Sequence, residues 1–340
     1  MKILYFNSNC PNYTSEPLLH GLRILFGNKV VDIPRIDALY IQMNSKFKHK
    51  TRGNGFTIYN NLTDNEELQS SRYFWEKDIL EYDLYIISDI WEQWHEYIKL
   101  KDLVPSHKVV VIDNSNHRIF PIGPHTKRFP FLMFYTLKRN VYFKKNMSRV
   151  VNNIYSFKSL FFNIIQSFYK PKNLFPIAFS IPKSKITIID EQFKEKDFTK
   201  QIVDRDVFRF VNNSSFNAIG SNNHIFEDEK SFYDDIQKSR FGITGKREYW
   251  DSLRNYEYAA NGCVLCYKNL HLKPNNCSPF GLNESNCIPY TNADNLFSKI
   301  HSIGPVEYAK LLKNSYEWIF QQTTDVRARW FIDKCKNAFK

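Results

Sequence analysis

The stretch that decides the fold is RFGITGKREYWDSLRNYEYAANGCVLCY, residues 240–267. Its pattern predicts a strand, a turn hinged at Gly245, an amphipathic helix, an Asn-Gly stop and a buried strand. A helix that starts just after a strand exposes free N–H groups, and these attract anions together with the helix dipole. We therefore expect a ligand site where the first strand meets the helix.

Basic side chains crowd the start of this helix. Lys246, Arg247 and Arg254 lie there, and Arg binds phosphate oxygens through two parallel hydrogen bonds. Glu257 follows Arg254 by one helical turn, and a carboxylate accepts hydrogen bonds from a pair of ribose hydroxyls. The pattern predicts a nucleotide diphosphate site, with Gly245 letting the backbone approach a phosphate. The alternative is a surface helix on which Arg254 and Glu257 only form an ion pair.

Two segments of the chain resemble the GT-B glycosyltransferases. The run KREYWDSLRNYEYAANGCVL is similar to their C-terminal donor-binding element, in the CgeB-like variety of single-chain bacterial-type enzymes with Arg-x-x-Glu before a small-residue stretch and Gly-Cys. The chain start, MKILYF with LLHGLRILFGNKVVDIPR, is similar to their first strand, helix and second strand. Residues 40–230 match only loosely. The resemblance implies an α/β fold of two Rossmann-like domains facing a cleft, with a C-terminal helix crossing back onto the first domain.

The same resemblance implies an activity and a set of site residues. The activity is transfer of a hexose from a nucleotide-diphosphate sugar, with retention of configuration and without a metal or other cofactor. The donor-binding positions are Gly245, Lys246, Arg247, Asp251, Arg254, Glu257, Phe280 and Gly281. Many retaining members carry Glu-x7-Glu here, whereas this chain has Tyr249 at the place of the first Glu. The resemblance therefore implies a ribose-binding role for Glu257 more strongly than it implies a sugar-contacting role for Glu248 or Asp251.

An inverting enzyme would need a general base near the acceptor hydroxyl. Ligands of parallel sheets bind at the carboxyl ends of the strands, and several polar side chains of the first half follow predicted strands. The candidates for the base are His20, Asp89, Asp113 and His117. Each of them also fits an ordinary core or surface position.

Length and composition favour two domains. The chain has 340 residues, is 43% hydrophobic and has a mean hydropathy of −0.47. We expect domains at 1–170 and 171–305, followed by closing helices at 306–340 that pack back on the first domain. No run approaches the ~20 apolar residues of a membrane span, and the first residues are too short for a signal peptide, so a cytoplasmic location is expected. Cys263 and Cys266 lie within a predicted buried strand, where residues three apart face opposite sides, and this argues against a zinc knuckle with Cys277 and Cys287.

The net charge of +12 comes from a single segment. Residues 114–189 hold 13 Lys and Arg and no Asp or Glu. In the densest part, 127–172, basic residues alternate with aromatic ones. This part could dock on an anionic membrane surface, could bind nucleic acid, or could supply interdomain core residues with solvated cations. The acceptor could accordingly be a glycan, a lipid-linked glycan or a modified nucleic acid.

Two other functions stay open for this sequence. A nucleotide-sugar epimerase or hydrolase would keep the fold and consume the donor without an acceptor. A basic protein on a transferase-like scaffold would bind nucleic acid or an anionic membrane and ignore free nucleotides.

Hydrophobic periodicity gives the remaining elements. We expect strands at 3–6, 29–33, 83–88, 108–113, 186–189, 241–244 and 262–267. We expect helices at 16–26, 90–100, 147–168 and 230–238, and one or two helices across 305–339.

Overall fold

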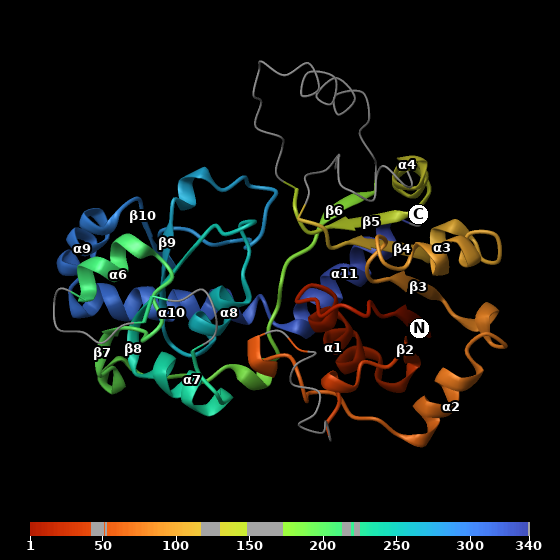
Figure 1. Cartoon of the computed structure of the whole chain (residues 1–340), viewed down its shortest axis with the longest axis horizontal. Helices are drawn as coiled ribbons and strands as arrows, with labels where there is room; N and C mark the ends of the chain where they lie inside the picture. Colours follow the sequence, from red (N-terminus) through yellow and green to blue (C-terminus); the bar gives the residue numbers. More distant parts are fainter. Residues whose placement is uncertain are drawn as a thin grey trace, which may run out of the picture.

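The structure is a computed structural model that describes residues 1–41, 51, 53–116, 130–147, 173–212, 219–220 and 225–338. It has two lobes, each built around a parallel sheet (Figure 1). The first sheet has the strand order β2-β1-β3-β4-β5-β6. Its strands are β1 (Ile3–Phe6), β2 (Val30–Ile33), β3 (Leu84–Ile87), β4 (Val109–Asp113), β5 (Val141–Lys144) and β6 (Leu174–Pro176).

The strands of the first sheet consist largely of Val, Ile, Leu, Tyr and Phe, as expected for a sheet that is covered on both faces. The helices of this domain are α1 (Ser15–Phe26), α2 (Glu66–Phe74), α3 (Trp94–Leu100) and α4 (Pro130–Arg139). Asn65 starts α2, because its side chain accepts a hydrogen bond from the Leu68 amide at 2.9 Å.

The second sheet has the order β10-β9-β8-β7, again with all strands parallel. Its strands are β7 (Lys196–Phe198), β8 (Ser239–Gly245), β9 (Val264–Lys268) and β10 (Cys287–Tyr290). The helices of this domain are α6 (Arg205–Asn212), α7 (Glu229–Gln237), α8 (Leu253–Ala260) and α9 (Ala293–Ser302). Gly262, at φ +75°, makes the turn between α8 and β9. The predicted order of strand, turn, helix, Gly stop and strand is confirmed.

Two closing helices return the chain to the first lobe. They are α10 (Pro305–Phe320), which runs along the second domain, and α11 (Thr324–Ala338), which packs on α1 (Figure 1). The contact is close, because a Cβ atom on Gly21 would lie 2.0 Å from the carbonyl oxygen of Thr324. Both ends of the chain therefore lie in the first lobe, as expected for a C-terminal helix that crosses back.

Some predicted elements differ from the structure. Residues 186–189 form no strand, because their amides bond to helices: Thr187 N–H to the Ala260 carbonyl at 2.9 Å and Ile189 N–H to the Tyr316 hydroxyl at 2.8 Å. Helix α3 begins at Trp94 rather than near residue 90, after a turn in which Asp89 accepts from the Trp91 amide. The first sheet includes β6 and so runs past residue 170. The predicted helix 147–168 lies almost wholly outside the described residues.

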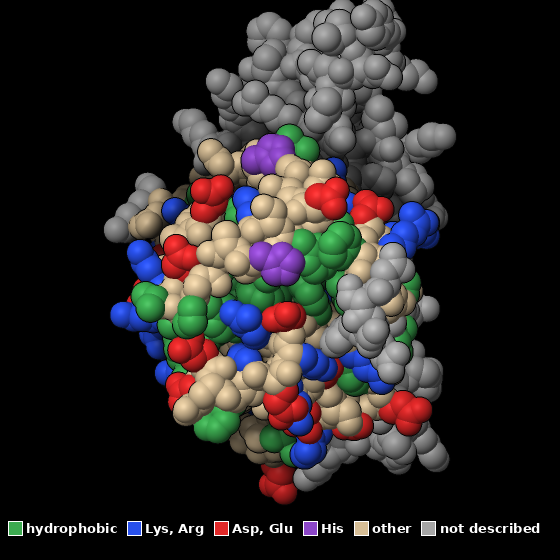
Figure 2. Space-filling model, turned by 90° about the vertical axis from the view of Figure 1, so that its left-hand side faces the viewer, with side chains coloured by type: hydrophobic (Ala, Val, Ile, Leu, Met, Phe, Trp, Pro, Cys, Tyr) green, Lys and Arg blue, Asp and Glu red, His purple; other side chains and the backbone are tan. Residues whose placement is uncertain are grey.

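Within the described part of the chain, no helix is both long enough and apolar enough to traverse a bilayer. Figure 2 shows the end of the second domain that faces away from the first, where acidic and basic side chains are interspersed. Most of the basic segment 127–172 lies outside the described residues, so its three interpretations stay predictions.

Candidate donor-binding site

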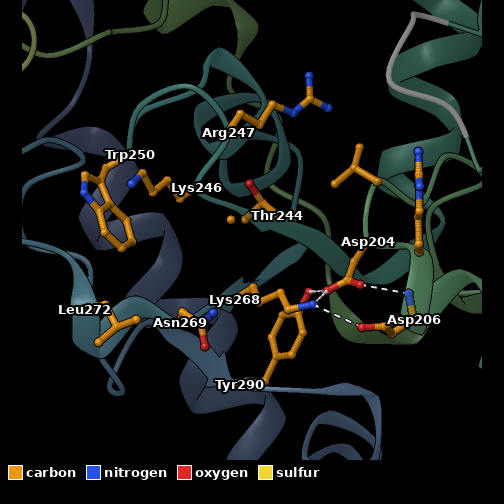
Figure 3. A pocket seen from close by; sticks show the side chains of 13 residues that line it. Asp204, Asp206, Thr244, Lys246, Arg247, Trp250, Lys268, Asn269, Leu272 and Tyr290 are labelled. Atoms are coloured by element: carbon orange, nitrogen blue, oxygen red, sulfur yellow. Dashed lines mark hydrogen bonds and ion pairs between the residues drawn. The ribbon is translucent and has the colours of Figure 1, made fainter. Parts of the chain in front are cut away.

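A hollow of about 580 Å³ lies at the carboxyl ends of the strands of the second sheet (Figure 3). This is where parallel α/β sheets bind ligands. Its walls come from the segment that follows β7, from the ends of β8 and β9 with the residues after them, and from Tyr290 at the end of β10. The lining residues are Val203, Asp204, Arg205, Asp206, Thr244, Gly245, Lys246, Arg247, Trp250, Lys268, Asn269, Leu272 and Tyr290.

One wall of this hollow has its charges paired. Asp204 forms an ion pair with Lys268 at 2.8 Å and accepts a hydrogen bond from the Tyr290 hydroxyl at 2.9 Å. Asp206 lies 3.5 Å from the same Lys268 ammonium. Burial alone would raise the pKa of Asp204, but the bonds from Lys268 and Tyr290 bring it below its ordinary value. The two carboxylates of this wall are thus balanced by contacts within it.

The opposite wall carries cations that have no counterion among the described residues. Lys246 and Arg247 follow β8 and line the hollow, with the Lys246 ammonium 5.2 Å from the centre of the Trp250 ring. Arg254 lies behind this wall in the first turn of α8, 9% exposed. Its Nη2 donates to Gln201 Oε1 at 3.0 Å, whereas its Nη1 is buried without a partner in the part of the chain that the structure describes.

The two guanidinium groups also repel each other. Burial and the charge of Arg254 lower the pKa of Arg247. Among the described residues no carboxylate forms an ion pair with Lys246, Arg247 or Arg254. Two neighbouring guanidinium groups in a partly desolvated place are costly unless an anion joins them. The arrangement can bind a group with several negative oxygens.

Asp251 has a structural role in this structure. Its carboxylate is buried and accepts from the Phe179 amide at 3.1 Å and from the Tyr256 hydroxyl at 3.0 Å. Burial raises the pKa of Asp251. It fixes the segment between β8 and α8 against the linker from the first domain, and it does not line the hollow. Its predicted place at the donor is therefore not supported by the geometry.

Glu257 lies on α8, buried between the two domains and outside the lining of the hollow. Its Oε1 accepts a hydrogen bond from the Thr57 hydroxyl at 2.5 Å, and Thr57 belongs to the first domain. Burial raises the pKa of Glu257 to about 7. Arg254 acts on Glu257 by charge, but the two do not form the ion pair that the alternative interpretation required. A ribose would have to replace Thr57 to bond this carboxylate.

Phe280 and Gly281 lie in a loop that packs on the closing helices. The Phe280 carbonyl accepts from the Trp318 indole at 2.7 Å, and Gly281 has φ +75°. Neither residue lines the hollow. Their predicted donor contact would need a ligand that extends beyond it.

Two of the four predicted bases are held in structural roles. His20 lies between α1 and α11, with its Nδ1 2.9 Å from the Thr324 hydroxyl, and burial lowers its pKa to about 4. Asp113 is buried and paired with Lys144 at 2.9 Å, and it accepts from the Trp91 indole and the Tyr142 hydroxyl. Burial would raise the pKa of Asp113, but Lys144 and these bonds bring it below its ordinary value. Neither side chain is placed to take a proton near neutral pH.

Asp89 differs from these two. It follows β3 at the carboxyl end of the first sheet, and burial, followed by the nearby charge of Asp113, raises its pKa to about 7. A carboxyl with this pKa exchanges protons at neutral pH. The fourth candidate, His117, lies outside the described residues.

The sequence interpretation misses several residues that line the hollow. Asp204 and Asp206 follow β7, a region for which the pattern gives no element, while Lys268 and Tyr290 end β9 and β10. The rule that parallel sheets bind ligands at their carboxyl ends would indicate these positions. Trp250 lies in the quoted segment, but its spacing alone gives it no role.

The cysteines do not form a metal site. Cys263, Cys266, Cys277 and Cys287 are buried free thiols, and burial raises the pKa of Cys263 to about 12. In the described ranges no group of three or more His, Cys, Asp or Glu side chains could hold a metal ion. The zinc-knuckle alternative therefore has no support.

Comparison with known proteins gives similarity of structure and not of sequence. No protein-family model matches the chain, and no curated protein sequence matches it. HepE of Anabaena, solved with UDP-glucose, has a TM-score of 0.53 at 10% identity, covering 99% of this chain and 100% of that one. A glycosyltransferase of Rickettsia africae has a TM-score of 0.53 at 10% identity, covering 99% and 98%. A trehalose-6-phosphate synthase has a TM-score of 0.53 at 11% identity, covering 99% of both chains.

The similarity to each of these structures extends over 99% of this chain. The chain has the GT-B fold. The fold class that the sequence predicted is confirmed, whereas identities near 10% leave the activity and its residues to be argued from the site.

Proposed function

We propose that the protein is a glycosyltransferase that moves a sugar from a nucleotide-diphosphate sugar to an acceptor hydroxyl. The second domain binds the donor in the hollow between β7 and β10, and the first domain holds the acceptor. The observation that carries the proposal is the pair Arg247 and Arg254, two neighbouring guanidinium groups with no carboxylate partner among the described residues.

The chemistry follows from the charges at this wall. When the bond between the anomeric carbon and the diphosphate oxygen breaks, negative charge grows on the diphosphate. Lys246, Arg247 and Arg254 stabilise that charge in a fixed, partly desolvated place. These three cations supply the positive charge that a metal ion would otherwise bring, so we propose that transfer needs no metal.

Three structures of one structural neighbour support the nucleotide part of the proposal. HepE of Anabaena was solved with UDP-glucose, with UDP, and with UDP and glucose. We infer that a uridine diphosphate sugar is the first donor to test. Glu257 is proposed to bind the ribose once the Thr57 hydroxyl has moved away, and Gly245 to admit a phosphate next to the backbone.

We propose retention of configuration for the transfer, because the trehalose-6-phosphate synthase of similar fold was studied for glycosyl transfer with retention. In a retaining reaction the leaving diphosphate oxygen itself takes the proton of the acceptor hydroxyl as the new bond forms. No separate protein base is then required, and Asp89 is not essential.

Inversion is a second candidate, and one observation favours it. Asp89, with a pKa raised to about 7, could take the acceptor proton as the diphosphate leaves from the opposite side of the sugar. The anomeric configuration of the product, read from its NMR coupling constants, separates the two routes. Membership of the CgeB-like subfamily and an acceptor that is membrane-bound or a nucleic acid are proposals that rest on the sequence alone.

Calorimetric titration with UDP tests the proposed function. Arg247→Ala and Glu257→Ala should each weaken UDP binding, whereas Arg329→Ala, an exposed arginine on α11, should not. Loss of one charge-assisted hydrogen bond corresponds to a ~10- to 100-fold higher Kd. Unchanged UDP affinity in Glu257→Ala would remove the ribose role, and unchanged affinity in Arg247→Ala would remove the diphosphate site.

A further inference from the structure

A second hollow lies in the first domain, and the function proposed above assigns it no ligand. It sits at the carboxyl ends of β1 and β2, between α2 and α3, and has a volume of about 430 Å³. This volume falls within the ~300–1,000 Å³ of typical small-molecule sites. Its apolar walls include Phe6, Ile33, Trp75, Ile79, Leu100 and Leu103.

The charge of this hollow is opposite to that of the donor hollow. Its rim carries three carboxylates, Glu76, Glu92 and Glu96, and one cation, Lys99. None of the four forms an ion pair in the part of the chain that the structure describes. The donor hollow is lined instead by four basic and two acidic side chains. A phosphate group is therefore attracted to the second domain and repelled from this hollow.

Two buried amide side chains form a polar floor. The first is Gln93, which is 6% exposed. Its Oε1 accepts from the Ser88 hydroxyl at 3.2 Å and from the Asp89 amide at 2.9 Å. These bonds assign the orientation of the amide. They leave its Nε2 group without a hydrogen-bond partner among the described residues, and Gln93 lines the hollow.

The second amide is Asn7, which is 5% exposed. Its Nδ2 donates to Asp32 Oδ2 at 3.2 Å and to the Pro34 carbonyl at 2.8 Å. Its Oδ1 has no partner in the described part of the chain. The floor thus offers one free donor, Gln93 Nε2, and one free acceptor, Asn7 Oδ1. The other polar atom of each amide is held by hydrogen bonds to the protein. Neither atom is among the fully buried polar atoms of the described residues, so a ligand in the hollow can reach both.

We propose that this hollow binds a saccharide unit that carries no phosphate or carboxylate, as part of the acceptor. A sugar hydroxyl both donates and accepts, so it satisfies the free groups of Gln93 and Asn7. The apolar face of a sugar ring packs on the Trp75 side chain. The rim carboxylates accept from further hydroxyls or from the ammonium of an amino sugar.

The position of the hollow fits an acceptor site, and this part of the inference rests on the proposed function. The same Gln93 carbonyl that orients the floor is bonded to the amide of Asp89. Ser8, in the loop after β1, donates its amide to the Ser88 hydroxyl at 3.1 Å and its own hydroxyl to Glu92. The hollow is therefore joined by hydrogen bonds to the carboxyl end of β3, which Ser88 and Asp89 follow.

A printed glycan array tests the inference with the full chain, fluorescently labelled, at physiological salt. The array carries neutral, amino, phosphorylated and sulfated glycans. The variants are Trp75→Ala, Glu96→Lys and, as a matched control, Tyr73→Ala, an aromatic residue at the end of α2, two positions before Trp75, that is 80% exposed and outside the hollow. Calorimetry with UDP on each variant checks that the donor hollow is intact.

We expect neutral or amino glycans to bind, and Trp75→Ala to weaken that binding about tenfold while Tyr73→Ala does not. Glu96→Lys should weaken binding of the amino glycans. The inference is overturned if no neutral or amino glycan binds, if Trp75→Ala binds them as well as the wild type, or if only anionic glycans depend on Trp75. Glycan binding without UDP binding would instead contradict the proposed function and leave a saccharide site.

Discussion

The Thr57 hydroxyl donates a 2.5 Å hydrogen bond to the Glu257 carboxylate, and so joins a loop of the first domain to the donor helix of the second. Thr57 has φ +68°, a strained value for a β-branched residue. Its amide donates to Glu229 Oε1 at 2.6 Å, and its hydroxyl also contacts the Tyr233 hydroxyl at 2.8 Å. The Thr57 hydroxyl is thus already bonded to the Glu257 carboxylate, which is proposed to accept hydrogen bonds from the ribose hydroxyls.

The burial of the Glu257 carboxylate makes the free energy of unfolding depend on pH. The pKa of Glu257 is about 7 in the folded protein and near 4.5 when unfolded, because desolvation disfavours the charged form. The folded state therefore binds more protons between these values, and the free energy of unfolding falls as pH rises from about 4.5 to about 7. A shift of this size corresponds to on the order of 3 kcal/mol.

Urea unfolding of wild type and Glu257→Gln at about pH 5 and about pH 7.5 measures this contribution. A glutamine side chain cannot ionise, so the variant should lose less stability across the window than the wild type. Asp89 titrates in the same window and is present in both proteins, so the difference between them belongs to Glu257. Equal losses would show that Glu257 is not desolvated.

Arg254 should be needed for ligand binding more than for folding. Its Nη1 is buried without a partner among the described residues, and its charge lowers the pKa of Arg247. Arg254→Met keeps most of the side-chain volume and removes this charge. We expect its free energy of unfolding to stay within about 1 kcal/mol of wild type, since only the bond to Gln201 is lost. A much larger loss in denaturant melts without nucleotide would mean that Arg254 is structural.

Asp89→Asn should leave most of the transferase activity. The amide oxygen can still accept from the Trp91 amide, and retention needs no protein base. We expect kcat within about tenfold of wild type, because general base catalysis is worth roughly 10²- to 10⁴-fold when it is used. A loss beyond about a hundredfold, with loss of the rise in rate as pH passes about 7, would favour inversion and make Asp89 the base.

The return of α11 to the first domain depends on Gly21. A Cβ atom there would lie 2.0 Å from the Thr324 carbonyl oxygen and 2.9 Å from the Ala328 Cβ, and backbone cannot move away cheaply. Gly21→Ala should therefore lower the free energy of unfolding by about 1–3 kcal/mol.

Gly304→Ala is the matched control for this substitution. Nothing lies within 4 Å of a Cβ atom at Gly304, the N-cap of α10, so only the ~0.5–1 kcal/mol of a poorer helix cap is expected. Thermal unfolding of both variants checks the pair. Equal shifts in Tm would contradict the close packing of α1 on α11.

The segment from β8 to β9 is the part of the second domain that the sequence predicts in most detail. Residues 239–268 combine a continuous apolar strand, a Gly turn and an Asn-Gly stop, and these local signals act in the same direction. Strands β5 and β6 are not predicted; both are short and lie in the acid-free basic segment 114–189. The expected strand at 186–189 is wrong, because its amides bond to α8 and α10 and such partners are set by tertiary packing.

The candidate site is also predictable only in part, because tertiary packing brings some of its residues together. Lys246, Arg247 and Arg254 are near one another in sequence, so spacing on one turn and one helix places them together. Lys268 and Tyr290 reach the hollow from separate strands, and only the topology of the sheet brings them to Asp204. The contact between Thr57 and Glu257 joins residues 200 positions apart, and no local pattern indicates it.

Calorimetric titration with UDP, GDP, ADP, CDP and TDP, each with and without magnesium, tests the central claim most directly. We expect one of these nucleotides to bind selectively, without a requirement for magnesium, and Arg254→Met to raise its Kd at least about tenfold. Binding of none of these nucleotides, or equal binding by the Arg254→Met protein, would contradict the assignment of this hollow as the donor site.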